Sequence, residues 1–430
     1  MVNDLSANII PGGQYGFSSA LDFLDHRQTE KGGVVLFPTQ KNAAIFLKEH
    51  SFLKGLLGWN NFLDEPVLLG RLPDHMGFSP PNHNTSYPRP LSEPDLIYIK
   101  QALSHIALCE FSKGNVDDAI TVVATQNVFN PVENYLKSLK WDGIDRLNTW
   151  MHFSYGAERT ELNRQIGRKF LIAAVRRAVY ERYKFDSMLI LEGPKGIRKS
   201  TSLRVLFGDE YFTESPLKIT DKEAAQSVSG FWGVEYAELR GFREADNNAQ
   251  KDWLSRQEDV YRKPYARKSV RVARRCVMTA TVNDSKYLKE APGDRRFWPV
   301  KCLEAGEFDI DWLEFSRDQL WAEAYHAALT TDEPTWLDDE LMIDLSSGQE
   351  ERRENHVWEE VLQDYLEQQE APSLDRGFRA SDLLGSALGI PVERRDKKAA
   401  STLKSAMEAL GWGQRVIREG DSTVRKYFKM

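Results

Sequence analysis

The sequence has little cysteine and no long hydrophobic run. Its three cysteines, Cys109, Cys276 and Cys302, lie far apart and form no Cys-x-x-Cys or Cys/His cluster. This argues against a zinc site or a disulfide framework and fits a reducing compartment. No apolar run reaches eighteen residues, and the first residues lack the basic and apolar regions of a signal peptide. We therefore expect a cytoplasmic protein with no membrane partner.

The composition is that of a globular protein with more than one domain. Hydrophobic residues make up 41% of the chain and charged residues 28%, which argues against extended disorder. A length of 430 residues suits two or three domains.

The charge is unevenly distributed. The formal net charge is −7, yet residues 261–275 hold seven Lys or Arg and no acidic residue. Residues 380–430 hold ten Lys or Arg against six Asp or Glu, so the rest of the chain is strongly acidic. One basic run alone is more often a solvated face. Two in an acidic body favour contact with a polyanion, and nucleic acid is the candidate.

Composition and hydrophobic periodicity divide the chain into five segments. A strand (33–38) and then helices (41–50, 95–110 and 116–126) are predicted in the first segment. A long amphipathic helix, 161–183, dominates the second. The predicted segments are a mixed α/β N-terminal domain of unknown role (1–130), a helical lead-in (131–185), an α/β core (186–302), a helical lid with an acidic linker (303–355) and a C-terminal domain (356–430).

The C-terminal segment has the element order of a winged helix. Helices are predicted at about 356–369, 381–388 and 397–410, followed by two strands around the turn Glu419–Ser422. A winged helix commonly places its third helix in the major groove of duplex DNA. The unit either docks duplex or origin DNA in this way, or docks a partner protein or caps an assembly. The basic candidates for DNA contact are Arg394, Arg395, Lys397, Lys398 and Lys404.

The motif most informative about function is a glycine-containing loop between a predicted strand (187–191) and a predicted helix (199–207). Its pattern approaches G-x-x-x-x-G-K-[ST], with Gly193, Lys199 and Ser200 in register. In such a loop backbone N–H groups wrap phosphates, the lysine neutralises their charge and the hydroxyl holds Mg²⁺. ATP and Mg²⁺ are therefore the predicted ligands. The loop residues predicted to bind them are Gly193, Pro194, Lys195, Gly196, Ile197, Arg198, Lys199, Ser200 and Thr201.

Arg198 stands where the pattern requires its second glycine. Glycine allows the backbone to approach the nucleotide closely, whereas Arg198 adds a Cβ and a long cationic side chain. That side chain either hinders the nucleotide, points away from it or adds a phosphate contact. The substitution leaves open whether the loop supports ATP hydrolysis.

Three further motifs follow in the order that an ATPase requires. A second strand (231–239) carries Glu238 at its end, our first candidate for positioning Mg²⁺ and water, and Glu235, our second. Asn283 ends the apolar run 276–284 and is a candidate for orienting water. Arg295 and Arg296 are candidates for contacting the γ-phosphate held by a neighbouring subunit.

These motifs resemble those of the virulence-associated protein E family of bacterial mobile elements and phages. The matching segments are NPVENYLKSLKWDGIDRLNTW, FDSMLILEGPKGIRKSTSLRVL, WGVEYAEL, EDVYRKPYARK and GDRRFWPV. The resemblance implies an AAA+-like P-loop NTPase core related to superfamily 3 helicases. It also implies a ring of six subunits linked to replication of phage or island DNA. It assigns phosphate and Mg²⁺ binding to Lys199 and Ser200, the Walker B acid to 235–238, sensor 1 to Asn283 and the arginine finger to Arg295 or Arg296.

The first basic island lies where superfamily 3 motors place a hairpin that grips single-stranded DNA. The resemblance implies that Arg262, Lys263, Arg267 and Lys268 contact DNA phosphates in the channel of the ring, with Tyr261 or Tyr265 stacking on bases. Arg262 and Arg267 have a competing role as phosphate contacts between subunits. The alternative to a helicase-type, DNA-dependent ATPase is a catalytically weak, nucleotide-gated DNA-binding protein that assembles on or interferes with replicating DNA.

Overall fold

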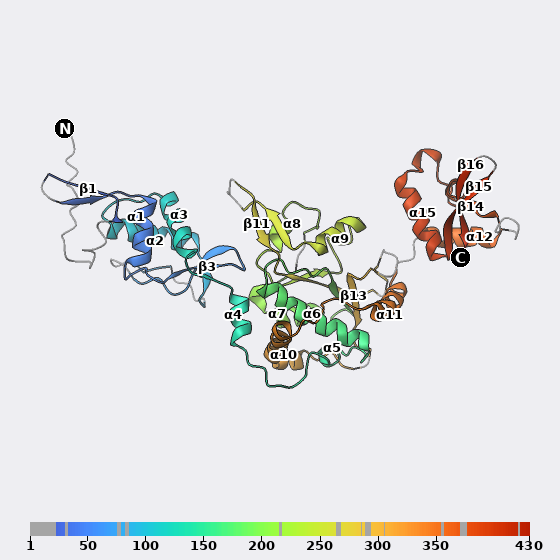
Figure 1. Ribbon diagram of the computed structural model, residues 1–430, viewed down its shortest axis with the longest axis horizontal. Helices are drawn as coiled ribbons and strands as arrows, with labels where there is room; N and C mark the ends of the chain where they lie inside the picture. Colours follow the sequence, from blue (N-terminus) through green and yellow to red (C-terminus); the bar gives the residue numbers. More distant parts are fainter. Residues whose placement is uncertain are drawn as a thin grey trace.

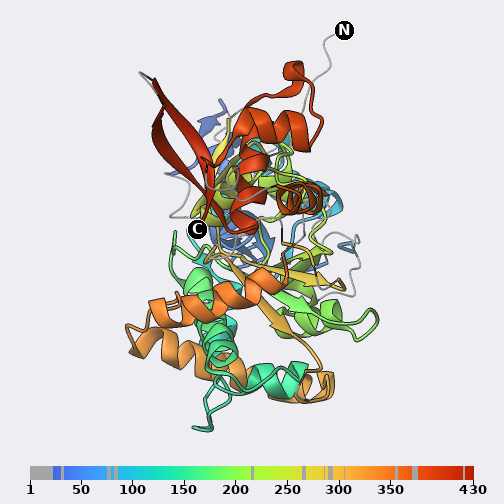
Figure 2. The ribbon, with the colours of Figure 1, turned by 90° about the vertical axis from the view of Figure 1, so that its right-hand side faces the viewer.

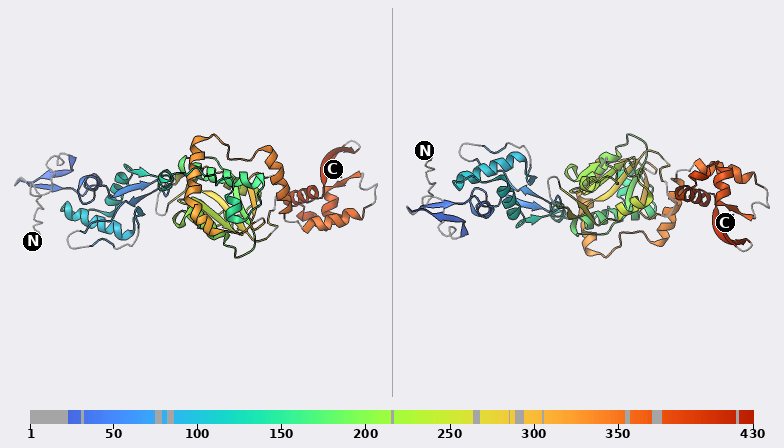
Figure 3. Two further views of the ribbon diagram at one scale, coloured as in Figure 1. Left: turned by 90° about the horizontal axis from the view of Figure 1, so that it is seen from below. Right: turned by 90° about the horizontal axis from the view of Figure 1, so that it is seen from above.

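Three units of secondary structure lie in a row along the molecule (Figures 1 and 3). The computed structural model describes residues 23–30, 33–74, 79–81, 86–214, 217–263, 268–284, 286–288, 294–304, 306–353, 357–369, 376–419 and 422–430. Within these residues the protein is mixed α/β, and its largest sheet is parallel. No described helix is both long and apolar enough to cross a bilayer.

The N-terminal unit combines small sheets with three helices around a hydrophobic core of its own. Thr39, Ser92 and Ser112 cap the helices by accepting backbone N–H bonds, as the N-cap preference for hydroxyl side chains explains. The helices are α1 (Gln40–Glu49), α2 (Glu93–Ile106) and α3 (Lys113–Ala124), and the strands are β1 (His26–Gln28), β2 (Val34–Leu36), β3 (Leu57–Asn60), β4 (Glu65–Leu68), β5 (Arg89–Pro90) and β6 (Val128–Phe129).

A five-stranded parallel sheet forms the centre of the middle unit. Its spatial order is β13 (Phe297–Lys301), β7 (Met188–Glu192), β12 (Val277–Val282), β9 (Gly233–Ala237) and β8 (Phe212–Glu214). From β7 the chain passes to the far edge at β8, returns through β9 to β12, and then adds β13 on the other side of β7. The order therefore reverses between β7 and β12, and ligands of open α/β sheets bind outside the carboxyl ends of strands at such a point.

The sheet is buried because its two faces pack against different helices. Leu189 and Leu191 of β7 join a core with α6 (Glu161–Val179), α7 (Lys199–Phe207) and α10 (Ile310–Thr330). The alternate residues Met188 and Ile190 join a second core. That core includes α8 (Ala224–Ser227) and α9 (Asn247–Ser255), next to the antiparallel hairpin of β10 (Glu258–Tyr261) and β11 (Val270–Ala273).

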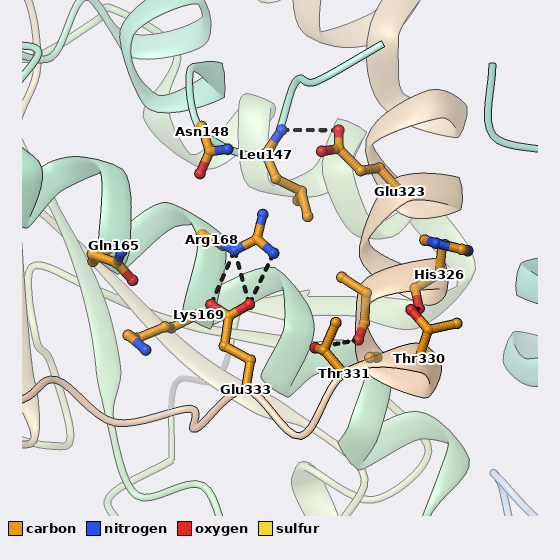
Figure 4. Close-up of polar contacts among 12 residues, drawn as sticks. Leu147, Asn148, Gln165, Arg168, Lys169, Glu323, His326, Thr330, Thr331 and Glu333 are labelled. Carbon is orange, nitrogen blue, oxygen red and sulfur yellow. Dashed lines mark hydrogen bonds and ion pairs between the residues drawn. The ribbon is translucent and has the colours of Figure 1, made fainter. Parts of the chain in front are cut away.

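Polar contacts fix the lead-in segment, which contains α4 (Pro131–Ser138) and α5 (Trp150–Tyr155), to the middle unit. The carboxylate of Glu323 on α10 accepts a bond from the backbone N–H of Leu147 at 3.0 Å (Figure 4). It also accepts a bond from the backbone N–H of Arg146 at 2.7 Å. Arg168 of α6 pairs with Glu333, its Nε lying 2.9 Å from both carboxylate oxygens. The lead-in is therefore part of the middle unit.

The segment expected to be an acidic linker contains a packed helix. Asp339–Glu351 form α11, whose buried Leu341 and Leu345 join the core beneath α6. Gln349 donates to the carbonyls of Asp294 and Phe297, both at 2.8 Å. The acidic composition gave no sign of this i, i+4 pair of leucines, which packs into the core, while α11 as a whole contacts both α6 and β13.

The C-terminal unit also has a separate hydrophobic core. Its order is α12 (Val357–Glu367), β14 (Phe378–Arg379), short helical turns over Ala380–Asp382 and Leu383–Ala387, α15 (Lys397–Ala409), β15 (Trp412–Glu419) and β16 (Ser422–Lys429). The expected order of helices followed by a hairpin is present, although the second helix is only a few short turns. Viewed from this end of the molecule, the β15–β16 hairpin projects beside α15 (Figure 2).

Candidate functional site

The loop between β7 and α7 lies at the carboxyl edge of the parallel sheet. β7 ends at Glu192 and α7 begins at Lys199, so the strand–loop–helix context expected from the sequence is present. The neighbouring strand in space is β12, which puts the loop at the point where the strand order reverses. The other predicted site residues are distributed around this point.

Lys199 is almost completely buried and connects the loop to the next strand. Its ammonium donates to the carbonyls of Gly193 and Pro194, at 2.7 and 3.0 Å, and to Oδ1 of Asn283, at 3.0 Å. Burial lowers the pKa of Lys199, since desolvation disfavours the charged form. The cation is thus already surrounded by oxygen atoms at the base of the loop.

Arg198 adopts the left-handed conformation that glycine takes without penalty. Its φ and ψ are 70° and 33°, and it forms the N-cap of α7 without a side-chain cap bond. Its side chain is exposed. The loop therefore keeps a glycine-type backbone at the position where the sequence departs from the pattern, at a cost in strain.

Glu235 is fully buried beneath α7. Its Oε1 accepts bonds from the hydroxyls of Ser200, at 2.7 Å, and Thr281, at 2.5 Å, whereas its Oε2 has no hydrogen-bond partner. Burial raises the pKa of Glu235, and the two hydroxyls oppose this shift. A buried carboxylate oxygen without a partner, beside a hydroxyl, is a place where a cation would be stabilised.

Glu238 contacts Asn283 on the side away from Lys199. It follows β9 with a positive φ of 52°, and its Oε1 accepts a bond from Nδ2 of Asn283 at 2.5 Å. Because Asn283 also accepts from Lys199, the three polar groups form one chain of contacts. The structure thus brings Ser200 to Glu235 and Asn283 to Glu238, whereas the sequence analysis preferred Glu238 as the partner of Ser200 at the metal.

The residues present fit Mg²⁺ as a ligand shared with phosphates. No group of three or more His, Cys, Asp or Glu that could hold a metal ion occurs among the described residues. Mg²⁺ does not need such a cage, because it keeps several waters and usually binds one or two carboxylates together with substrate phosphates. Ser200 and Glu235 would supply the hydroxyl and the carboxylate of such a donor set.

Arg295 and Arg296 lie at the amino ends of the parallel strands, opposite the loop. Their carbonyls accept bonds from Ser187 and Met188, at the amino end of β7. Arg295 is half exposed and pairs with Asp186 at 2.7 Å, and Arg296 pairs with Asp294 at 3.3 Å. Neither arginine therefore belongs to the site formed around Lys199 of the same chain.

The first basic island is only partly a surface feature. Arg274 and Arg275 are buried, Arg274 in an ion pair with Asp259 and Arg275 donating to the carbonyl of Ala178. Arg262 and Lys268 are exposed, as a DNA contact requires. Tyr261, considered for base stacking, is instead buried with its hydroxyl 2.8 Å from Ser229. Arg267 and Tyr265 lie outside the described residues.

Lys263, which was also predicted to contact DNA, already has a partner. Its Nζ lies 2.7 Å from Oδ2 of Asp64 in the N-terminal unit. Any phosphate contact by Lys263 must therefore compete with this carboxylate.

The basic residues of the C-terminal unit are more accessible. Arg394, Lys397 and Lys404 are exposed near α15. Arg395 is partly buried and donates through Nε to the carbonyl of Ile390 at 2.9 Å, so it also stabilises the turn before the helix. The side chain of Lys398 lies outside the described part of the structure.

Two charged residues near the loop were missed by sequence reasoning. Glu192 ends β7 immediately before Gly193, and Arg352 pairs with it from the end of α11. A lone acid ending an apolar strand was a weak signal for Glu192. No sequence pattern connects it with Arg352, 160 positions later.

Comparisons with known proteins support one family. The model of the virulence-associated protein E-like domain matches residues 136–355. A search of curated proteins finds no match. Among solved structures, the apo structure of the NrS-1 C terminal region (305-718) gives a TM-score of 0.42 at 9% identity, covering 87% of this chain and 96% of that chain. Two A form apo structures of the same region each give 0.43, at 10% and 11% identity, with the same coverage.

Proposed function

The chain belongs to the virulence-associated protein E-like family, and from this premise we propose that it is a DNA-dependent ATPase of helicase type that serves replication of a phage or mobile element. One observation carries the proposal. Lys199, Ser200, Glu235, Glu238 and Asn283 meet at the carboxyl edge of a parallel sheet, where its strand order reverses. This is where open α/β sheets bind ligands.

The loop supplies the groups that a triphosphate needs. Lys199 exchanges its carbonyl partners for phosphate oxygens, and the amino end of α7 offers free N–H groups. Ser200 and Glu235 hold Mg²⁺, which when bound neutralises charge on the phosphates. The unpartnered Oε2 of Glu235 favours this role for it over Glu238.

Hydrolysis assigns a different role to Glu238. Water attacks the γ-phosphorus, the bond to the ADP oxygen breaks, and the proton of the water passes to a carboxylate. The bonds of Asn283 to Glu238 and to Lys199 support Glu238 and Asn283 as the residues that hold and orient that water. Arg295 or Arg296 of a neighbouring chain stabilises the charge of the transition state, which requires assembly, in this proposal a hexameric ring.

DNA contact is assigned to the exposed basic residues. Arg262 and Lys268 flank the tip of the β10–β11 hairpin and are proposed to contact single-stranded DNA in the ring. The C-terminal unit, as a winged helix, is proposed to dock duplex DNA through Arg394, Lys397 and Lys404. Deletion of 356–430 is then expected to abolish duplex binding and to spare ATP hydrolysis.

The test is ATP hydrolysis by the purified chain, with and without single-stranded DNA. We expect turnover that DNA stimulates and that Lys199→Ala removes. Lys222→Ala, which changes an exposed lysine remote from the loop in sequence, is the matched control and is expected to behave as wild type. Turnover that survives Lys199→Ala would contradict the assignment of the loop.

A second candidate function is favoured by Arg198. Its strained backbone and long side chain stand where catalysis requires close approach to the phosphates. In this alternative the chain binds ATP without turning it over, and the nucleotide only stabilises assembly on DNA. ATP binding without hydrolysis in wild type, with hydrolysis gained in Arg198→Gly, would select this function.

A further inference from the structure

A buried ion pair adjoins the loop between β7 and α7, which we call the phosphate loop. Glu192 is the last residue of β7, and its side chain is almost completely buried. Its Oε2 lies 2.5 Å from Nε of Arg352, which comes from the end of α11. The next residue along the chain is Gly193, the first glycine of the loop, so this carboxylate adjoins the proposed position of the phosphates.

Arg352 is held in place from three sides. Its Nη1 donates to the carbonyl of Gly348 at 2.6 Å. Its own carbonyl accepts bonds from the N–H groups of Tyr287 and Leu288, at 2.9 and 3.0 Å. Tyr287 and Leu288 follow Asn283 in the chain after β12. A single residue thus connects the strand before the loop with the segment that follows the other strand of the site.

The positive charge of Arg352 also stabilises the buried carboxylate of Glu192. Burial raises the pKa of Glu192, and the nearby Arg352 opposes that shift. If Arg352 were removed, the site would contain either an unpaired buried carboxylate, which repels phosphates of the same sign, or a protonated acid with a lost partner. Both changes disturb the end of β7.

We propose that Arg352 is a positioning residue for nucleotide binding, which neutralises Glu192 and fixes the end of β7 against the segment after Asn283. It touches neither substrate nor reacting atoms, so its effect is transmitted through Glu192. The inference rests on the proposed nucleotide site.

Arg353, the next residue, connects the same end of α11 to the C-terminal unit. Arg353 pairs with Glu359 of α12 through two bonds, at 2.6 and 2.8 Å. The two neighbouring arginines therefore attach the phosphate loop and the C-terminal unit to the same end of α11.

Titration calorimetry of the full chain with ATP and Mg²⁺ tests the role of Arg352. We expect Arg352→Ala to weaken binding by about tenfold or more, because the carboxylate of Glu192 loses its counter-charge. Adding Glu192→Gln removes that charge, and the double variant is expected to recover to within about threefold of wild type. Arg353→Ala is the matched control, because it keeps the Glu192 pair and is expected to bind as wild type does.

Two results would overturn the proposal. One is wild-type affinity in Arg352→Ala, and the other is a double variant that binds as weakly as a folded Arg352→Ala. The second result would mean that Arg352 acts only by supporting α11. If Arg352→Ala does not fold, the double variant, which has no unpaired buried charge, decides alone, and binding about tenfold weaker than wild type contradicts the inference. Absence of binding by wild type would instead overturn the proposed function.

Discussion

Lys263 of the first basic island (residues 261–275) forms an ion pair with Asp64 of the N-terminal unit. The ammonium lies 2.7 Å from Oδ2 of Asp64 and 5.7 Å from the centre of the Trp59 ring. The same turn buries Phe62 edge-on against Tyr211, with ring centres 5.7 Å apart. The turn between β3 and β4 therefore joins the N-terminal unit to the hairpin proposed to contact DNA.

The first prediction concerns this ion pair. Asp64→Asn removes the carboxylate that competes with DNA phosphates for Lys263. We expect tighter binding of single-stranded DNA, and a plot of log affinity against log salt that is steeper by about 0.7, the value for one added phosphate contact on a single strand. Fluorescence anisotropy over a series of salt concentrations measures both quantities.

The control for this prediction is Asp74→Asn. It changes the net charge equally, but Asp74 pairs only loosely with Arg71, at 3.8 Å on the surface. Equal gains in the two variants would mean that only net charge matters and that Lys263 does not contact DNA.

The second prediction concerns backbone strain at Arg198. Because its φ is 70°, Arg198→Gly is expected to raise the free energy of unfolding by up to about 1 kcal/mol, offset in part by the greater freedom of glycine in the unfolded chain. Urea unfolding measures the change. Arg182→Gly is the matched control, since Arg182 has a φ of 58° away from the loop. A loss of stability in Arg198→Gly alone would show that the arginine side chain stabilises the loop.

The third prediction concerns pH. The pKa of Glu235 is raised in the folded protein above its ordinary value of 4.5, so the folded state holds this proton more tightly than the unfolded state. Wild type should therefore lose stability relative to Glu235→Gln as pH rises from 4.5 through the raised pKa. Urea unfolding of both proteins across this range measures the difference. A constant difference would mean that Glu235 titrates normally, and its burial would then need another explanation.

The fourth prediction concerns the two edges of the sheet. Lys199→Ala removes the loop cation and leaves Arg295 and Arg296 intact, whereas Arg295→Ala with Arg296→Ala does the reverse. Each variant alone is expected to lose ATP hydrolysis. An equal mixture should regain activity at about a quarter of its interfaces if chains associate at random. Hydrolysis assays of the mixture measure this, and no recovery would contradict an arginine supplied by a neighbouring chain.

Sequence reasoning succeeded where the signal was local. The strand–loop–helix around Lys199 and the polar ends of β9 and β12 were predicted, because each depends on residues close together in the chain. The partners of Lys263 and Glu192 were not predicted, since Asp64 and Arg352 come from distant segments. Arg274 was counted as surface charge because a basic run gives no sign of which cations are buried with a partner.

Because all strands of the sheet run in the same direction, the carboxyl ends and the amino ends of the strands carry chemically different groups. Lys199 lies at the carboxyl edge and Arg295 at the amino edge, separated by the five residues of β7, or about 16 Å. That separation exceeds the reach of an arginine side chain. If the arginines act as proposed, one chain therefore cannot complete its own site, and contact between chains must be head-to-tail. Such contact forms a closed ring only when its rotation returns to the starting point, and otherwise continues as an open filament.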